Sequence, residues 1–153
     1  MDDWLDDAEQ RAWRSLAAVI LKLPAELEQA LQRDAGLSHI EYWVMALLSE
    51  APDGRLQLRH LAAQANASLS RLSHVVTRLD RRGFVVREPV PEDARATFAV
   101  LTDEGHAQVV AAAPGHVATV RALVFDGLSE QDVGDLERLC VSIAGRLDQR
   151  RPV

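Results

Sequence analysis

The chain has 153 residues, 48% of them hydrophobic and 26% charged, and a formal net charge of -6 at pH 7. These values are ordinary for a soluble globular domain with one core. The longest purely apolar run, Leu16 to Leu21, is too short to span a bilayer, so we expect no membrane segment. A single cysteine excludes an internal disulfide, and the acidic N-terminus lacks the positive flank of a secretory signal; both features predict a cytoplasmic protein.

The charge is unevenly distributed along the chain. Between Arg55 and Arg87 there are seven arginines and one acid, Asp80, so this segment carries +6. Because the whole chain carries -6, the remainder must sum to -12. Salt limits the reach of distant charges to roughly 8 Å at physiological ionic strength, so a local basic surface can still bind phosphates.

A long helix is predicted from about Asp7 to Asp34, with Gly36 ending it. Pro24 lies inside this helix and predicts a kink or a division. Apolar residues recur every three or four positions, which suits packing along another helix. This stripe consists of Trp13, Leu16, Ile20, Leu23, Leu27 and Leu31.

A second helix follows the capping box formed by Ser38 and Glu41. We expect one apolar face on it, made of Ile40, Trp43, Val44, Leu47 and Leu48. The turn residues at 51–54 end this helix, and a short extended piece follows at 55–58. A third, short helix is predicted from Leu58 to Ala65, and the next residue, Asn66, can take a left-handed turn.

The fourth helix begins at Ser68, a good N-cap residue, and ends at Gly83. Its inward residues are predicted to be Leu72, Val75, Val76 and Leu79. Its outward residues are polar or basic: Ser70, Arg71, Ser73, His74, Thr77 and Arg78. Two short helices joined by a tight turn, the second one basic outside, are typical of a helix-turn-helix.

Two strand-like runs come next, Phe84 to Arg87 and Thr97 to Leu101, on either side of a proline-rich, charged segment at 89–96. They predict a β-hairpin, and a hairpin directly after a recognition helix is a wing.

Thr102 then caps a helix that reaches Pro114 and Gly115 and resumes to Phe125, and Ser129 caps the last helix. The last helix has its own apolar stripe, made of Leu136, Leu139, Cys140, Ile143 and Leu147. Long stripes at both ends of a small chain suggest that these helices pack on each other and on a second copy.

The order of these motifs resembles the MarR family of bacterial winged helix-turn-helix transcriptional regulators. The resemblance rests on GLSHIEYWVMALL, on LRHLAAQANASLSRLSHVVTRLDRRGFVVRE and on PEDARATFAVLTDEG, which includes an Asp-x-Arg element at Asp93 and Arg95. It implies a mainly α fold with a small β-hairpin wing (α+β), assembled as an intertwined helical homodimer. Asn66 departs from the pattern, since the family commonly has glycine in this turn.

The resemblance also implies a division of labour along the chain. Residues 1–36 and 103–153 would form the dimerisation helices, and residues 37–102 the DNA-binding lobe. Each subunit would place one recognition helix in the major groove of a pseudo-palindromic double-stranded operator, with a wing arginine near the minor groove. Many members release DNA on binding a small aromatic or anionic effector, or on cysteine oxidation.

Residue chemistry selects the candidate DNA contacts. Arg71, His74 and Arg78 can reach base edges, since arginine bound to guanine by two hydrogen bonds is the commonest specific contact. The hydroxyls of the same face suit phosphates and sugars instead. The full set of candidates is Ser68, Ser70, Arg71, Ser73, His74, Thr77, Arg78 and Arg95. For Arg95, a surface ion pair with Asp93 is the alternative interpretation, and the aspartate could also orient the arginine for a narrow minor groove.

Candidate effector residues are Trp13, Arg14, His39 and Trp43, whose rings and cationic groups suit an aromatic carboxylate. Core packing is the alternative for the tryptophans, and a buried structural thiol is the default for Cys140. We expect no metal and no cofactor, although Glu104, His106 and His116 could contribute to a zinc site.

No catalytic motif occurs in the sequence, so the chain is not expected to be an enzyme. The remaining alternative to a DNA-binding regulator is a helical protein–protein interaction module that kept the fold and lost DNA binding.

Overall fold

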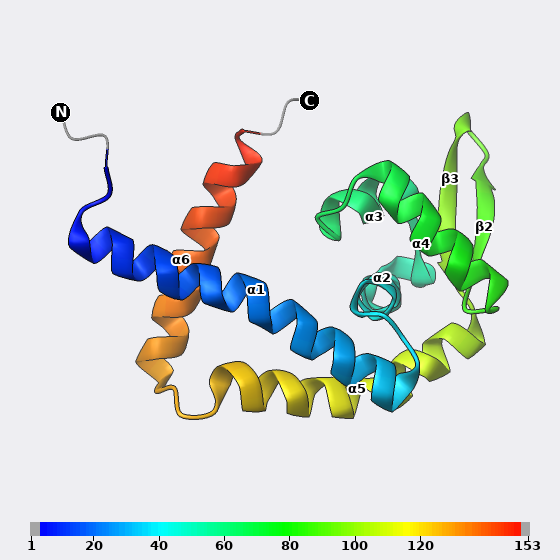
Figure 1. Ribbon diagram of the computed structural model, residues 1–153. Helices are drawn as coiled ribbons and strands as arrows, with labels where there is room; N and C mark the ends of the chain where they lie inside the picture. The colour runs from blue at the N-terminus through cyan, green and yellow to red at the C-terminus, as the bar shows by residue number, and fades with distance from the viewer. Residues whose placement is uncertain (1–3, 151–153) are drawn as a thin grey trace. The chain divides into compact units, whose positions relative to one another are not determined.

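The computed structural model describes residues 4–150 and is mainly helical, with one small antiparallel sheet (Figure 1). The expected fold class, a winged helix-turn-helix, is confirmed. In chain order the elements are α1 (Asp7–Ala35), α2 (His39–Glu50), η1 (Pro52–Gly54), β1 (Arg55–Gln57), α3 (Leu58–Gln64), α4 (Leu69–Arg81), β2 (Val85–Val90), β3 (Asp93–Leu101), α5 (Asp103–Val120), η2 (Arg121–Phe125) and α6 (Glu130–Asp148).

The chain forms two compact units that divide between Val117 and Ala118. The first unit contains α1 to β3 and most of α5, and the second contains η2 and α6. The boundaries expected from the family resemblance, at residues 36 and 103, concern which helices dimerise and stay a prediction.

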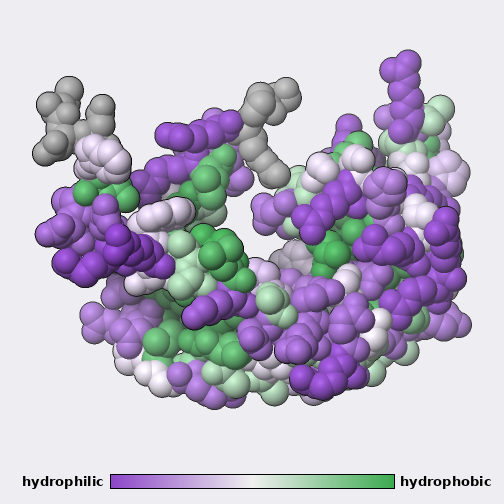
Figure 2. Space-filling view, in the orientation of Figure 1, coloured by the Kyte–Doolittle hydropathy of each residue, from purple (hydrophilic) through white to green (hydrophobic). Residues whose placement is uncertain are grey.

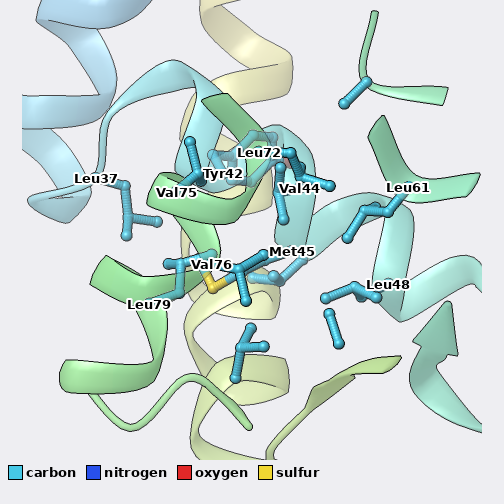
Figure 3. Packing of buried hydrophobic residues seen from close by; sticks show 14 of the residues in the cluster. Leu37, Tyr42, Val44, Met45, Leu48, Leu61, Leu72, Val75, Val76 and Leu79 are labelled. Atoms are coloured by element: carbon cyan, nitrogen blue, oxygen red, sulfur yellow. The ribbon is translucent and has the colours of Figure 1, made fainter. Parts of the chain in front are cut away.

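The core of the first unit lies between α2, α3, α4 and the sheet. All four predicted inward residues of α4 are at most 2% exposed. Figure 3 shows Val76 and Leu79 of α4 beside Met45 of α2, and Leu72 and Val75 near Tyr42 and Val44. The 3.6-residue period therefore identified the buried face of the recognition helix correctly.

The predicted face of α2 is confirmed at Val44 and Leu48, which are fully buried, and at Ile40 and Leu47, which are partly buried against the core, but it is wrong at Trp43. Glu41, Val44, Met45 and Leu48 point into the core, whereas Trp43 is 41% exposed. Sequence period alone did not separate the two faces because apolar residues occupy both sides of this helix. The capping box was predicted correctly: Ser38 Oγ accepts from the Glu41 backbone N–H at 3.2 Å, and the Glu41 carboxylate accepts from the Ser38 N–H at 2.9 Å.

Helix α1 runs unbroken through Pro24, so the expected division of this helix does not occur. Proline removes one backbone N–H, and the turns on either side of it stay helical. Only the C-terminal part of α1 is buried, at Leu27, Ala30 and Leu31, before Gly36 ends the helix in the left-handed conformation (φ 63°). The apolar side chains of its N-terminal half are exposed, among them Trp13, Val19, Ile20 and Leu21.

The wing is longer than predicted. Strands β2 and β3 pair up to Val90 and Asp93, which leaves only Pro91 and Glu92 at the tip. The proline-rich segment was expected to be loop, but Pro89 lies on an edge strand, where a missing N–H costs no ladder bond. Strand β1 pairs with β3 on its other side, giving the sheet order β1-β3-β2, which the sequence did not predict.

Helix α5 meets the base of the wing at Gly105. A Cβ atom there would overlap the carbonyl oxygen of Phe84, so only glycine permits this close approach. Thr102 stabilises the same contact between α5 and the wing. Its hydroxyl donates to the Gly83 carbonyl at 2.7 Å and accepts from the Gly105 N–H at 3.0 Å. The leucine-threonine element after the wing therefore ties α5 to the end of the recognition helix.

The second unit begins inside the last turn of α5, which continues into the π-helical turn η2. Ser129 caps α6 through a capping box with Asp132, and no residue of α6 is buried. By length and composition alone, the helical span Asp103–Phe125 is apolar enough to cross a membrane, with a mean hydropathy of 1.3 in its most apolar window. The span contains no long uninterrupted apolar run, because Gln108, Pro114, His116 and Thr119 break it into short pieces.

Candidate nucleic-acid interface

Helix α4 presents a polar and basic face to solvent. Ser68 Oγ accepts the Arg71 backbone N–H at 3.1 Å and so fixes the start of the helix. The inward residues anchor the opposite side in the core, which leaves Ser70, Arg71 and His74 pointing outward. Figure 2 shows mostly hydrophilic residues over α4 and the wing.

The arginines of this region fall into two groups. Among the residues that the structure describes, no ion pair or side-chain hydrogen bond engages the guanidinium groups of Arg59, Arg71, Arg81 and Arg95. These four cations are therefore available to a ligand. The other group, Arg55, Arg78, Arg82 and Arg87, is bound to the protein itself.

Arg87 joins the wing to the recognition helix. Its Nη2 donates to the Ser73 carbonyl at 2.8 Å, to Ser73 Oγ at 3.1 Å and to Thr77 Oγ1 at 3.0 Å. The two hydroxyls expected to meet phosphates thus already have a partner within the lobe. This arrangement sets the angle between wing and helix, since it crosses from β2 to the middle of α4.

Arg78 and Arg82 are bound at the other end of α4. Arg78 Nε and Arg82 Nη1 each lie 3.3 Å from a different carboxylate oxygen of Glu41, whose side chain is 7% exposed. The arginine side chains themselves are 49% and 37% exposed. The sequence predicted Arg78 as a base contact. In the free protein, however, its Nε is bound to Glu41 of α2.

Arg55 lies at the edge of the sheet. Its Nη1 lies 3.8 Å from Glu88 Oε2, in an ion pair. The guanidinium carbon lies over the Phe98 ring, 4.8 Å from the ring centroid.

A hollow of about 370 Å³ lies between the start of α3, the start of α4 and the wing. Arg59 and Arg95 line it from two sides, with Leu69 and Ser73 from the recognition helix. Asp93 lines the hollow as well, so two cations against one carboxylate leave its lining with a net positive charge, which suits an anionic group such as a backbone phosphate.

The wing residue Arg95 is oriented through its backbone. The Asp93 carboxylate accepts the Arg95 backbone N–H at 3.0 Å, and no ion pair joins the two side chains in the described part of the chain. This hydrogen bond supports the interpretation that Asp93 orients Arg95, rather than the interpretation that the two form a surface ion pair.

The four candidate effector residues are not adjacent in one protomer. Glu28 of α1 accepts the His39 backbone N–H at 2.7 Å. Trp13 precedes Glu28 by 15 residues, which at 1.5 Å per residue is about 22 Å along the helix. Trp13, 54% exposed, and Arg14, whose guanidinium donates to Gln10, therefore lie far from His39 along α1.

His39 and His116 lie near each other beside Tyr42. The ring centroids of the two histidines are 6.0 Å apart, and that of His116 is 4.5 Å from Tyr42. Burial lowers the pKa of both imidazoles, so the neutral forms are favoured. His39 would thus meet an anion as a hydrogen-bond donor more than as a cation.

Cys140 is exposed in the protomer, whereas a buried thiol was the expected default. Its helix, α6, has no buried residue, because nothing in its own unit covers the apolar stripe. In the described part of the chain no three histidine, cysteine or acidic residues are placed to hold a metal ion.

Known proteins resemble this chain over most of its length. The sequence profile of the MarR family matches residues 35–96. The HTH-type transcriptional repressor YetL of Bacillus subtilis (strain 168) is 34% identical over 69% of this chain and 68% of its own. Sco3205, a MarR family transcriptional regulator from Streptomyces coelicolor solved in complex with DNA, is 41% identical with a TM-score of 0.91, covering 97% of this chain and 92% of that one.

The chain belongs to the MarR family. A second Streptomyces coelicolor regulator of this family, AbsC, is 38% identical with a TM-score of 0.91 over 96% of this chain and 99% of its own. Like these relatives, the chain is a DNA-binding transcriptional regulator with a winged helix and is not an enzyme.

Sequence reasoning missed three residues of this MarR-family lobe. Glu41 was recognised only as part of a capping box, and Arg59 and Arg87 were counted in the basic segment but given no role at the site. A signal existed for Glu41, since an acid on the core side of an apolar helix requires a buried partner.

Proposed function

We propose that this MarR-family regulator is a cytoplasmic, effector-responsive repressor that binds a pseudo-palindromic operator as a homodimer. The observation that carries the proposal is the row of unengaged cations, Arg59, Arg71 and Arg95, across α3, α4 and the wing. Similarity to YetL, a named repressor, supports the direction of regulation.

On the operator, α4 lies in the major groove and the wing approaches the adjacent minor groove. Arg71 and His74 read base edges near the start of α4, where recognition helices make their base contacts. Ser68, Ser70, Ser73 and Thr77 stay candidate phosphate contacts, and Arg78 stays a candidate base contact. Arg95 enters the minor groove, where a narrow A·T tract attracts arginine.

A second copy covers the apolar surfaces of the end helices. In the single chain Trp13 and Ile20 of the α1 stripe are 54% and 53% exposed, and Leu139 and Leu147 of the α6 stripe are 49% and 62% exposed. Contiguous apolar surface is rare on soluble monomers, so these stripes support a dimer formed by the N- and C-terminal helices. The apolar span Asp103–Phe125 would also be buried against the second copy, which accounts for its composition without a membrane.

The effector is a small aromatic or anionic molecule. Trp13 and Trp43 offer exposed rings, and Arg14 a cation. Because Trp13 lies about 22 Å along α1 from Glu28, which binds the His39 backbone, one pocket containing both Trp13 and His39 requires a residue from each copy. Binding then changes the spacing of the two recognition helices, which must match half-sites about 34 Å apart.

Repression is tested with a reporter driven by the regulator's own upstream region. Expression of the chain should lower reporter output, and an aromatic acid that quenches tryptophan fluorescence should restore it. If Trp13→Ala, Trp43→Ala and Arg14→Ala all leave quenching and release intact, the effector binds elsewhere. If only oxidant restores output, and Cys140→Ser abolishes that response, the signal is redox.

The second candidate function is a protein–protein interaction module. The net charge of -6 favours it, since an acidic protein is repelled from DNA. It predicts no binding to any upstream fragment, even at low salt.

A further inference from the structure

Glu41 stands out because it is the one buried charged residue in the described part of the chain. Its carboxylate accepts the Ser38 N–H at 2.9 Å, Arg78 Nε at 3.3 Å and Arg82 Nη1 at 3.3 Å. A buried carboxylate is costly unless it is paired and hydrogen-bonded, so the two arginines of α4 stabilise its charge.

The same contacts restrain the two arginines. They lie four residues apart, on the flank of α4 that faces α2, near the C-terminal end of the recognition helix. The Arg82 guanidinium also stacks on Phe84, 4.9 Å from the ring centroid. Both side chains stay more than one third exposed, so a phosphate could reach them if Glu41 released them.

We propose that Glu41 is a specificity-determining residue that withholds Arg78 and Arg82 from DNA phosphates. Phosphate contacts bind every sequence equally, and each one adds to the salt-dependent affinity for random DNA. Holding two cations against α2 lowers that affinity and leaves base readout to the start of α4, and this role replaces the one considered above for Arg78 as a base contact. The inference rests on the proposed function, in which the outward face of α4 meets DNA.

Glu41→Gln is the direct test. Glutamine keeps the size of the side chain and still serves at this position of a capping box, but it has no charge to pair with the arginines. The affinity for a random duplex should rise about tenfold, and the slope of log K against log salt should steepen by about 0.9 for each arginine released. The preference for operator over random DNA should fall accordingly. Circular dichroism checks that the variant is folded.

Asp80→Asn is the matched control. Asp80 lies on α4 itself and is exposed, and no ion pair engages it in the described chain. The substitution removes the same charge without releasing an arginine, so random-DNA binding should change far less than in Glu41→Gln. Equal gains in the two variants would mean a general charge effect and would overturn the proposal.

If Glu41→Gln does not fold, Arg82→Gln tests whether Arg82 contacts DNA phosphates. It leaves Glu41 paired with Arg78, so the lobe should stay folded. Because Arg82 is withheld from DNA, the salt slope on random duplex should be unchanged; a decrease of about 0.9 would show a phosphate contact and overturn the proposal. Unchanged random-DNA binding by folded Glu41→Gln would also overturn it. By contrast, a wild type that fails to prefer its operator would refute the proposed function itself.

Discussion

Replacing Arg71 with alanine separates DNA readout from stability. The Arg71 guanidinium has no partner in the described lobe, and the N-cap bond to Ser68 uses its backbone N–H, which alanine retains. The substitution therefore breaks no intramolecular interaction, and the free energy of unfolding should change by less than about 0.5 kcal/mol.

The cost on operator DNA follows from the number of contacts. A two-point arginine–guanine contact contributes about 1–3 kcal/mol of discrimination. A dimer on two half-sites makes the contact twice, so Arg71→Ala should cost about 2–6 kcal/mol, or at least about 25-fold in affinity. On random DNA, where no base is read, the loss should be much smaller.

Fluorescence anisotropy with operator and scrambled duplexes at several salt concentrations measures both effects. The expected result is a large loss on operator with a nearly unchanged salt slope. Equal losses on both duplexes, with a slope reduced by about 0.9 per protomer, would make Arg71 a phosphate contact and refute the assigned base readout. Arg81→Ala is the matched control, because Arg81 is also unengaged on α4 but lies at the far end of the helix.

Three further predictions concern the wing, its contact with α5 and the dimer. Arg95→Ala should weaken binding about tenfold where the operator has A·T-rich flanks, and unchanged footprinting titrations would show that the wing does not touch DNA. Gly105→Ala should lower the free energy of unfolding in urea by about 1–3 kcal/mol, because the new methyl overlaps the Phe84 carbonyl; an unchanged midpoint would contradict the close approach. Leu139→Glu should convert a dimer to monomer or unfolded chain in light scattering, since Leu139, 49% exposed in the protomer, would lie in the interface. A monomeric wild type would contradict the dimer.

The recognition helix was predictable from sequence because its two faces differ in kind. Apart from Leu69, which is 53% exposed, its aliphatic residues recur on one side and the rest are polar, so period alone separated Leu72 and Leu79 from Arg71. Helix α2 lacks that contrast: Trp43 and Val44 are both apolar, yet one is exposed and the other buried. Only the packing against α4 decides between them.

The contacts of the arginines could not be predicted, because they join residues far apart in the sequence. Glu41 and Arg82 are 41 positions apart, and Arg87 reaches back 14 positions to Ser73. Sequence gave the number of cations in the segment but not which of them the lobe binds internally. The same limit applied to β1, whose pairing with β3 depends on a strand about 40 residues away.

This MarR-family chain should bind one DNA sequence in preference to others. The most direct measurement is the affinity for a duplex from the gene's own upstream region against a scrambled duplex, over a range of salt concentrations. We predict a preference of at least about 1,000-fold and a strong salt dependence on both duplexes, with protection of two half-sites. Equal affinity for the two duplexes, or no complex at low salt, would contradict the claim.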